Sequence, residues 1–220
     1  MRETIIECLS CMLKDRLNLK WKSKEKKQQY VDFILKIIAL FSERGFYGAS
    51  INQAILDAGV PRSSILGSIS KKELFIFVAN AAITISRNEL FSLIPSDDAV
   101  SNSEINKFTK LLSAHLTECW DLCVISLVGN QFNQEKDLID TIEKAQSVWR
   151  MAFFRLAKVN WQLDCSADVA ASNCLIYLIS QMLLIQSDSI SKKKVQFICD
   201  KIGKYLKKEI ISLLTVSNNG

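Results

Sequence analysis

Apolar residues recur every three or four positions along most of this chain, a spacing that places them on one face of an α-helix. The pattern predicts an amphipathic helix over residues 1–20, a helix through Ile34 and Phe41, and two short helices between residues 51 and 70. Longer helices are predicted at about 72–93, 103–122, 124–131, 134–162, 166–186 and 191–215. Turn residues at the short spacing typical of strands are missing, as is any strand–helix alternation, so the predicted fold class is all-α.

The segment 41–75 reads FSERGFYGASINQAILDAGVPRSSILGSISKKELF and carries the clearest local signals. Gly45 can adopt φ > 0 and end the preceding helix, and Ser50 stands at the N-cap of the next one. Ala58-Gly59-Val60 predicts a tight turn, after which Pro61 presets φ for the first turn of a further helix. Two short helices joined by a glycine turn form a helix-turn-helix, whose second helix can enter a DNA major groove.

The order of residues in this segment resembles the N-terminal domain of the TetR family of bacterial repressors. The matching positions are Ala39 (one residue out of step with the pattern), Leu40, Phe41, Gly45, Phe46, Ser50, Ile51, Ala58, Gly59, Val60, Pro61, Arg62, Ser63, Ser64, Ile65, Lys72 and Phe75. The resemblance implies a helix-turn-helix three-helix domain at 24–75, preceded by an amphipathic and basic extension at 1–23. A helical effector-binding and dimerisation domain would then follow at 76–220.

The recognition helix departs from the family pattern. Ala54-Ile55 reverses the family's Ile-Ala pair, and the bulk of Ile55 is expected to shift the recognition helix. Leu66 replaces a tyrosine that usually contacts a phosphate, and Gly67 weakens a short helix. From the resemblance, Ser50 and Lys72 are expected on phosphates, and Arg62, Ser63, Ser64 and Ser68 in the groove. The complete set of expected DNA-binding positions is Ser50, Pro61, Arg62, Ser63, Ser64, Leu66, Ser68, Lys71 and Lys72.

Charge is unevenly distributed along the chain, whose formal net charge is +5. Residues 1–75 hold 13 Lys and Arg against 8 Asp and Glu, whereas residues 76–220 hold 15 of each kind. An excess of positive charge beside a helix-turn-helix is expected of a surface that meets phosphates, although a solvated lysine face gives the same count. The lysine-rich run from Lys14 to Lys27 is either a basic arm along DNA or a soluble linker.

The candidate chemistry outside this segment is sparse. The odd count of seven cysteines suits a reducing cytoplasm, where we expect the protein to reside. His115, Cys119 and Cys123 share one predicted helix face, where core packing is a commoner role than metal binding or thiol sensing. One histidine, no phosphate-binding glycine loop and no catalytic triad order indicate that the protein is not an enzyme and needs no cofactor or metal. The longest apolar runs, at 74–85 and 174–185, are too short to span a bilayer, so no membrane partner is expected.

Two further expectations concern the C-terminal region. The helix from Ala167 to Ile185 is apolar nearly all round, and with the helix at 191–215 it predicts a homodimer interface, although a central helix of a monomeric bundle would look the same. The resemblance also implies an effector pocket for a small apolar or aromatic ligand, although aromatic residues at this spacing often only fill a core. Its candidate lining is His115, Cys119, Trp120, Trp149, Phe153 and Tyr177.

Two functions remain open from the sequence. The first is a dimeric transcriptional repressor that binds a palindromic operator in double-stranded DNA and is released by a small molecule. The second is a TetR-fold protein whose degenerate recognition helix no longer reads DNA and which acts through protein contacts. The charge asymmetry favours the first, while Ile55, Leu66 and Gly67 favour the second.

Overall fold

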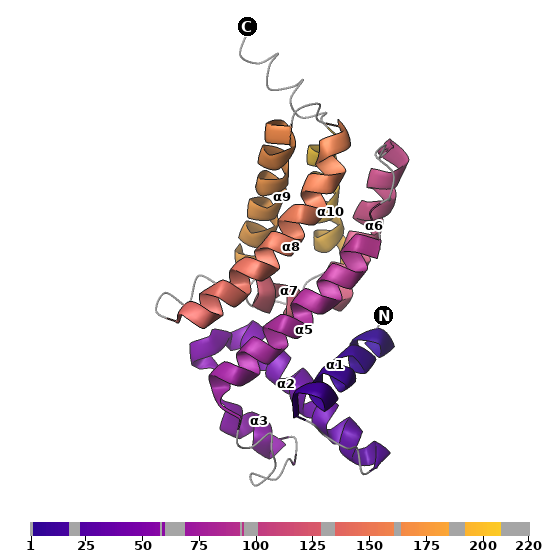
Figure 1. The fold of residues 1–220 in the computed structure, drawn as a ribbon. Helices are drawn as coiled ribbons and strands as arrows, with labels where there is room; N and C mark the ends of the chain where they lie inside the picture. The colour runs from indigo at the N-terminus through magenta and orange to yellow at the C-terminus, as the bar shows by residue number, and fades with distance from the viewer. Residues whose placement is uncertain are drawn as a thin grey trace, which may run out of the picture. The chain divides into compact units, whose positions relative to one another are not determined.

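The structure, a computed structural model, describes residues 2–17, 23–57, 59, 69–92, 94, 101–128, 135–160, 164–184 and 192–207. Within these residues the chain forms helices and no strand, which confirms the all-α prediction (Figure 1). The helices are α1 (Arg2–Leu17), α2 (Lys24–Gly48), α3 (Ile51–Asp57), α5 (Lys71–Ser92), α6 (Asn102–Glu118), α7 (Trp120–Leu127), α8 (Lys136–Asn160), α9 (Asp164–Leu184) and α10 (Lys192–Leu206).

The chain divides into two compact units. Unit 1 contains Met1–Ile85 and Asp121–Ala145, and unit 2 contains Ser86–Trp120 and Gln146–Gly220. Both α5 and α8 therefore contribute residues to each unit. Residues 121–145 join the N-terminal unit although the sequence grouped them with 76–220. This division reflects packing alone, so the proposed functional boundary after residue 75 stays a prediction.

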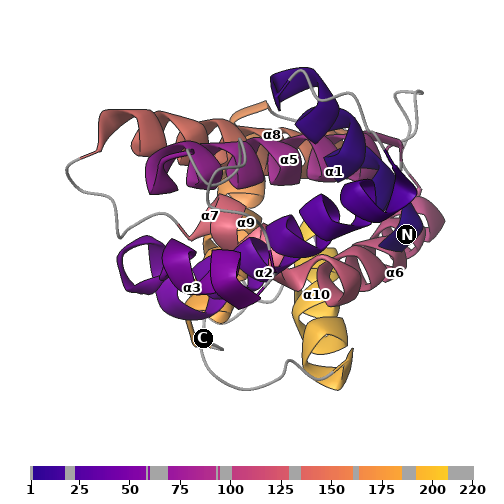
Figure 2. The ribbon, with the colours of Figure 1, turned by 90° about the horizontal axis from the view of Figure 1, so that it is seen from below.

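Unit 1 is built around α2. α1 packs against α2, and its Leu9 and Leu13 side chains are buried, so this helix of the N-terminal extension is part of the unit's core. α3 also contacts α2, and Figure 2 shows the two helices next to each other. Ser23 caps α2 by accepting a hydrogen bond from the Lys26 N–H.

Unit 2 is built around α10, which contacts both α6 and α9. α6 starts with a capping box in which Ser101 and Glu104 exchange side-chain and backbone hydrogen bonds. The apolar stripe of α10 is fully buried, and consists of Val195, Ile198, Cys199, Ile202 and Leu206. The sequence includes the helix at 191–215 in its predicted dimer interface, but this stripe is buried inside unit 2 and is unavailable to a second subunit.

The predicted helix boundaries near residue 120 are wrong. The sequence predicts helices over 103–122 and 124–131, whereas α6 ends at Glu118 and α7 extends from Trp120 to Leu127. Cys119 caps α6 with φ −115° and ψ 21°, and its N–H donates to the His115 carbonyl. No glycine or proline marks this break, so nothing in the local sequence signals it. His115 and Cys123 consequently do not share one continuous helix.

Two helices are longer than the apolar runs considered in the sequence. By length and composition alone, α5 and the segment Cys165–Leu184 of α9 could cross a membrane. In α5, 56% of the most apolar window is buried, as in the core helix of a globular protein, whereas the value for α9 is 39%. The expectation that these segments are too short to span a bilayer is therefore not supported by their length, and the cytoplasmic location stays a prediction.

Candidate functional site

The end of α2 is fixed by a glycine and a cluster of aromatic rings. Gly45 has φ 65° and ψ 179°, so it interrupts the helical backbone as the sequence predicted. The rings of Phe41, Phe46 and Phe75 then meet, with centroids 5.1 Å apart for Phe41–Phe75 and 5.5 Å apart for Phe46–Phe75. Because both contacts are edge-to-face and all three rings are buried, this cluster anchors the first turn of α5 to the end of α2.

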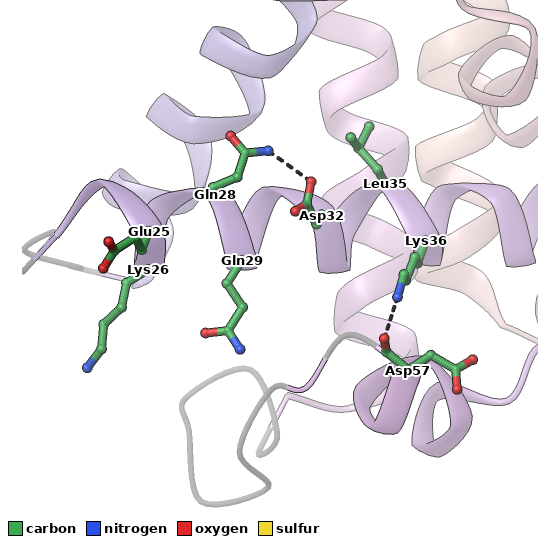
Figure 3. A pocket seen from close by; sticks show the side chains of 8 residues that line it. All are labelled: Glu25, Lys26, Gln28, Gln29, Asp32, Leu35, Lys36 and Asp57. Atoms are coloured by element: carbon green, nitrogen blue, oxygen red, sulfur yellow. Dashed lines mark hydrogen bonds between the residues drawn. The ribbon is translucent and has the colours of Figure 1, made fainter.

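The turn after α3 is held by side chains of α2. Gly59 has φ 63°, which confirms the predicted glycine turn at that residue. Gln29 Nε2 donates to the Gly59 carbonyl at 2.7 Å, and Lys36 Nζ donates to the carbonyl of Asp57. Figure 3 shows Lys36 reaching from α2 to the end of α3. These two hydrogen bonds cross between α2 and the turn and fix the point at which the chain leaves α3.

An open groove of about 780 Å³ lies along this contact (Figure 3). Its lining comes from α2 and the end of α3, and consists of Glu25, Lys26, Gln28, Gln29, Asp32, Leu35, Lys36 and Asp57. Gln28 and Asp32 are hydrogen-bonded to each other at 2.9 Å. Acidic and basic side chains alternate along the groove, so it presents no single charge to a ligand.

The residues expected to read DNA are only partly described. Ser50 precedes α3 directly, and its carbonyl accepts a hydrogen bond from the Ala54 N–H at 3.3 Å. Ala54 and Ile55 are both buried in unit 1, so the larger Ile55 side chain is accommodated in the core. The expected readers Pro61, Arg62, Ser63, Ser64, Leu66 and Ser68 lie outside the described residues, and their roles stay predictions.

Lys71 is engaged within unit 1. Its Nζ donates to the Tyr47 carbonyl at 3.1 Å and lies 5.2 Å from the centroid of the Phe46 ring. Burial lowers the pKa of this ammonium. A lysine held by a carbonyl and an aromatic face stabilises the junction between α2 and α5. Because its ammonium group is engaged in these contacts, Lys71 is less available to bind a phosphate.

Lys72 is also engaged, with two carboxylates that the sequence analysis did not single out. Its Nζ lies 2.8 Å from Asp137 Oδ2 and 2.9 Å from Glu135 Oε2. The hydrogen bonds that Lys72 donates to Asp137 and Glu135 raise the Lys72 pKa to about 12, and the same contact lowers the pKa of Asp137. Acidic residues at a helix start are an ordinary helix signal. The pairing of Glu135 with a lysine 63 positions earlier was therefore evident only from the tertiary structure.

In unit 2 the structure brings together part of the candidate effector pocket. The rings of His115 on α6 and Trp149 on α8 have centroids 5.9 Å apart, and Trp149 and Phe153 are 6.2 Å apart. Ser86 Oγ on α5 lies 3.4 Å from His115 Nε2. All four side chains are buried. Burial lowers the His115 pKa to about 4, so this imidazole is neutral at pH 7.

The other candidate pocket residues are placed differently. Cys119 is buried, and its burial raises the thiol pKa to about 12, which makes it a poor nucleophile at neutral pH. Trp120 and Tyr177 are half-buried. The open groove of about 510 Å³ in unit 2 lies between α6 and α10, and its lining includes none of the six candidates. The effector pocket therefore stays a prediction centred on His115, Trp149 and Phe153.

No two cysteines of the described residues form a disulfide. Burial raises the pKa of the Cys174 and Cys199 thiols to about 12, so these two side chains pack as small apolar groups. In the described part of the chain, no three His, Cys, Asp or Glu side chains are grouped so that they could hold a metal ion.

No protein-family model matches this chain, and no curated protein matches it either.

Proposed function

We propose that this protein is a TetR-like transcriptional regulator, most simply a repressor, that binds a palindromic operator as a homodimer. The observation that carries the proposal is the pair of positive-φ glycines, Gly45 and Gly59, on either side of α3. Together with the buried α2–α3 contact they support a helix-turn-helix framework, because the second helix would begin directly after the Gly59 turn. The positive charge excess of residues 1–75 supports contact with phosphates.

Dimerisation is proposed through the outward face of α9. Val169, Ile176 and Leu184 are 58%, 63% and 76% exposed, although each is a large aliphatic side chain. Their positions follow the helical repeat, so they lie along one stripe of α9, opposite the buried Ala170, Cys174 and Leu178 side of the helix. An exposed apolar stripe of this kind favours self-association about a twofold axis. Two recognition helices would then bind about one DNA turn, ~34–36 Å, apart.

Release by a small molecule is proposed through the His115, Trp149 and Phe153 cluster. A ligand that enters this apolar core would be flat or apolar, since the imidazole is neutral and the surrounding rings are hydrophobic. Such a ligand would regulate DNA binding if it favours one separation of the recognition helices over another.

A second function is favoured by a specific observation. Lys71 and Lys72, which open α5, are both held by groups of unit 1. Because these two cations already have partners, they are less suited to bind DNA phosphates, so a TetR-fold protein acting through protein–protein contacts is the alternative.

The experiment that separates the two functions is a salt-dependent binding assay with the DNA that flanks the gene for this protein. We expect the affinity to fall steeply between low and moderate salt, with a slope of about −0.9 per neutralised phosphate. A random duplex of equal length is the comparison, and modest discrimination between the two is expected because the recognition segment offers few long polar side chains. If neither duplex binds at low salt, the protein-contact function gains the support.

A further inference from the structure

We propose that Glu135 and Asp137 restrain Lys72 in an autoinhibitory contact, and that a DNA phosphate must displace these carboxylates before it can bind Lys72. The inference rests on the proposed DNA binding and adds to it an internal competitor for one of the expected phosphate contacts.

Glu135 and Asp137 occupy the ammonium group that a phosphate would bind. A lysine ammonium has three N–H donors, and Lys72 contacts two different carboxylates, at 2.8 and 2.9 Å. Carboxylate and phosphate oxygens accept charge-assisted hydrogen bonds from the same donors. A phosphate that approaches Lys72 therefore meets an ammonium that is already bound and a local negative charge that repels it.

The acidic residues are fixed in place by the start of α8. The Glu135 carbonyl accepts hydrogen bonds from the Leu138 and Ile139 N–H groups at 3.0 and 3.1 Å, so Glu135 opens the helix. Asp137 lies in the first turn of α8, where the helix dipole stabilises a negative charge. The helix start therefore fixes the backbone from which both carboxylates extend.

The position of Lys72 in its helix also favours pairing with an anion. It lies in the first turn of α5, at the end of the helix where the dipole disfavours a positive charge. The α8 carboxylates compensate for this placement while DNA is absent, and a phosphate would do so in the complex. One anion can therefore replace the other without leaving the ammonium unpaired.

The ion pairs of Lys72 are exposed enough for a phosphate to replace the carboxylates. The side chains of Lys72, Glu135 and Asp137 are 37%, 41% and 66% exposed. Ion pairs at this exposure are weak and screened by salt, so a DNA phosphate is a realistic competitor.

The test removes the two charges and compares the effect with a matched change. Glu135→Gln/Asp137→Asn keeps the shape of both side chains, while Asp140→Asn/Glu143→Gln removes two exposed charges from the same helix of the same unit. Each variant is made in the full chain with Lys72 present and with Lys72→Met. Binding to a short duplex of the flanking DNA is measured against salt, and thermal unfolding establishes that every variant is folded.

We expect Glu135→Gln/Asp137→Asn to tighten binding about two- to fivefold more than the matched variant, and Lys72→Met to abolish that excess. The salt slope should steepen by about 0.9, the value for one additional neutralised phosphate. Binding by the Glu135→Gln/Asp137→Asn variant in the absence of wild-type binding would support the inference even more directly.

Equal effects of the two charge-removing variants, or an excess that survives Lys72→Met, would overturn the inference and leave the proposed DNA binding intact. Absence of binding by wild type and by every variant at low salt would overturn both.

Discussion

Gly203 on α10 lies so close to Thr109 on α6 that a Cβ atom added to the glycine would stand 2.7 Å from Thr109 Cγ2. Thr109 cannot easily turn away, because its Oγ1 donates a hydrogen bond to the Asn106 carbonyl at 3.0 Å. The missing side chain at Gly203 therefore sets how closely α6 and α10 approach within unit 2.

Gly203→Ala is expected to lower the free energy of unfolding by ~1–3 kcal/mol, since overpacking outweighs the helix propensity gained from alanine. Thr109→Ser removes the obstructing methyl group, so Gly203→Ala should be neutral or stabilising in that background. Chemical denaturation of the four proteins of this cycle measures the coupling. Identical effects of Gly203→Ala in both backgrounds would show that Thr109 is not the obstacle.

His115 predicts a pH dependence of stability. Its folded-state pKa of about 4 lies below the usual value near 6.5, so the unfolded chain binds the proton more readily in this interval. Stability should consequently fall as the pH drops from about 6.5 to about 4, by an amount on the order of 3 kcal/mol for a fully neutral buried imidazole. Since the chain has one histidine, its NMR titration is unambiguous.

His115→Gln is the control for this effect, because it keeps a polar group near Ser86 but does not titrate. Its stability should change less than that of wild type over the same pH interval, as measured by thermal unfolding. An imidazole that titrates near pH 6.5 in the folded protein would contradict the buried, neutral histidine.

The α9 stripe predicts an oligomeric state. Ile176→Asp places a charge on the exposed stripe and should convert a dimer into a monomer at micromolar concentration, as measured by sedimentation velocity. Leu178 is unsuitable for this test because it is fully buried in unit 2, where a charge would unfold the protein. Leu56→Asp, which changes a similarly exposed leucine of unit 1, should leave the dimer intact. A wild-type protein that sediments only as a monomer would remove the proposed interface.

Substitution of Arg62 is expected to lower operator affinity more than substitution of Lys71. If the protein reads DNA directly, Arg62→Ala should cost ~1–3 kcal/mol of operator affinity and flatten base preference at one position in each half-site, because arginine pairs with guanine through two hydrogen bonds. Lys71→Ala should cost less affinity, since Lys71 is held by the Tyr47 carbonyl and the Phe46 ring. Competition binding against operator and random duplexes measures both effects. An Arg62→Ala protein that binds both duplexes like wild type would exclude direct readout by this residue.

The sequence by itself determined the helical class and several local features of the backbone. The positive φ of Gly45 and Gly59 follows from residue type and position, and so does the start of α5 near Lys72, because these signals act within a few residues. The apolar stripe of α10 was likewise evident from its spacing.

Only the tertiary structure decided which partners these residues meet. The stripe of α10 was assigned to a second subunit but is buried against α6 and α9, because an apolar face does not specify what covers it. The break at Cys119 has no local signal, and the ion pairs of Lys72 join residues more than 60 positions apart. Local propensity acts over one or two turns of helix, whereas packing and ion pairing depend on where distant segments come to lie.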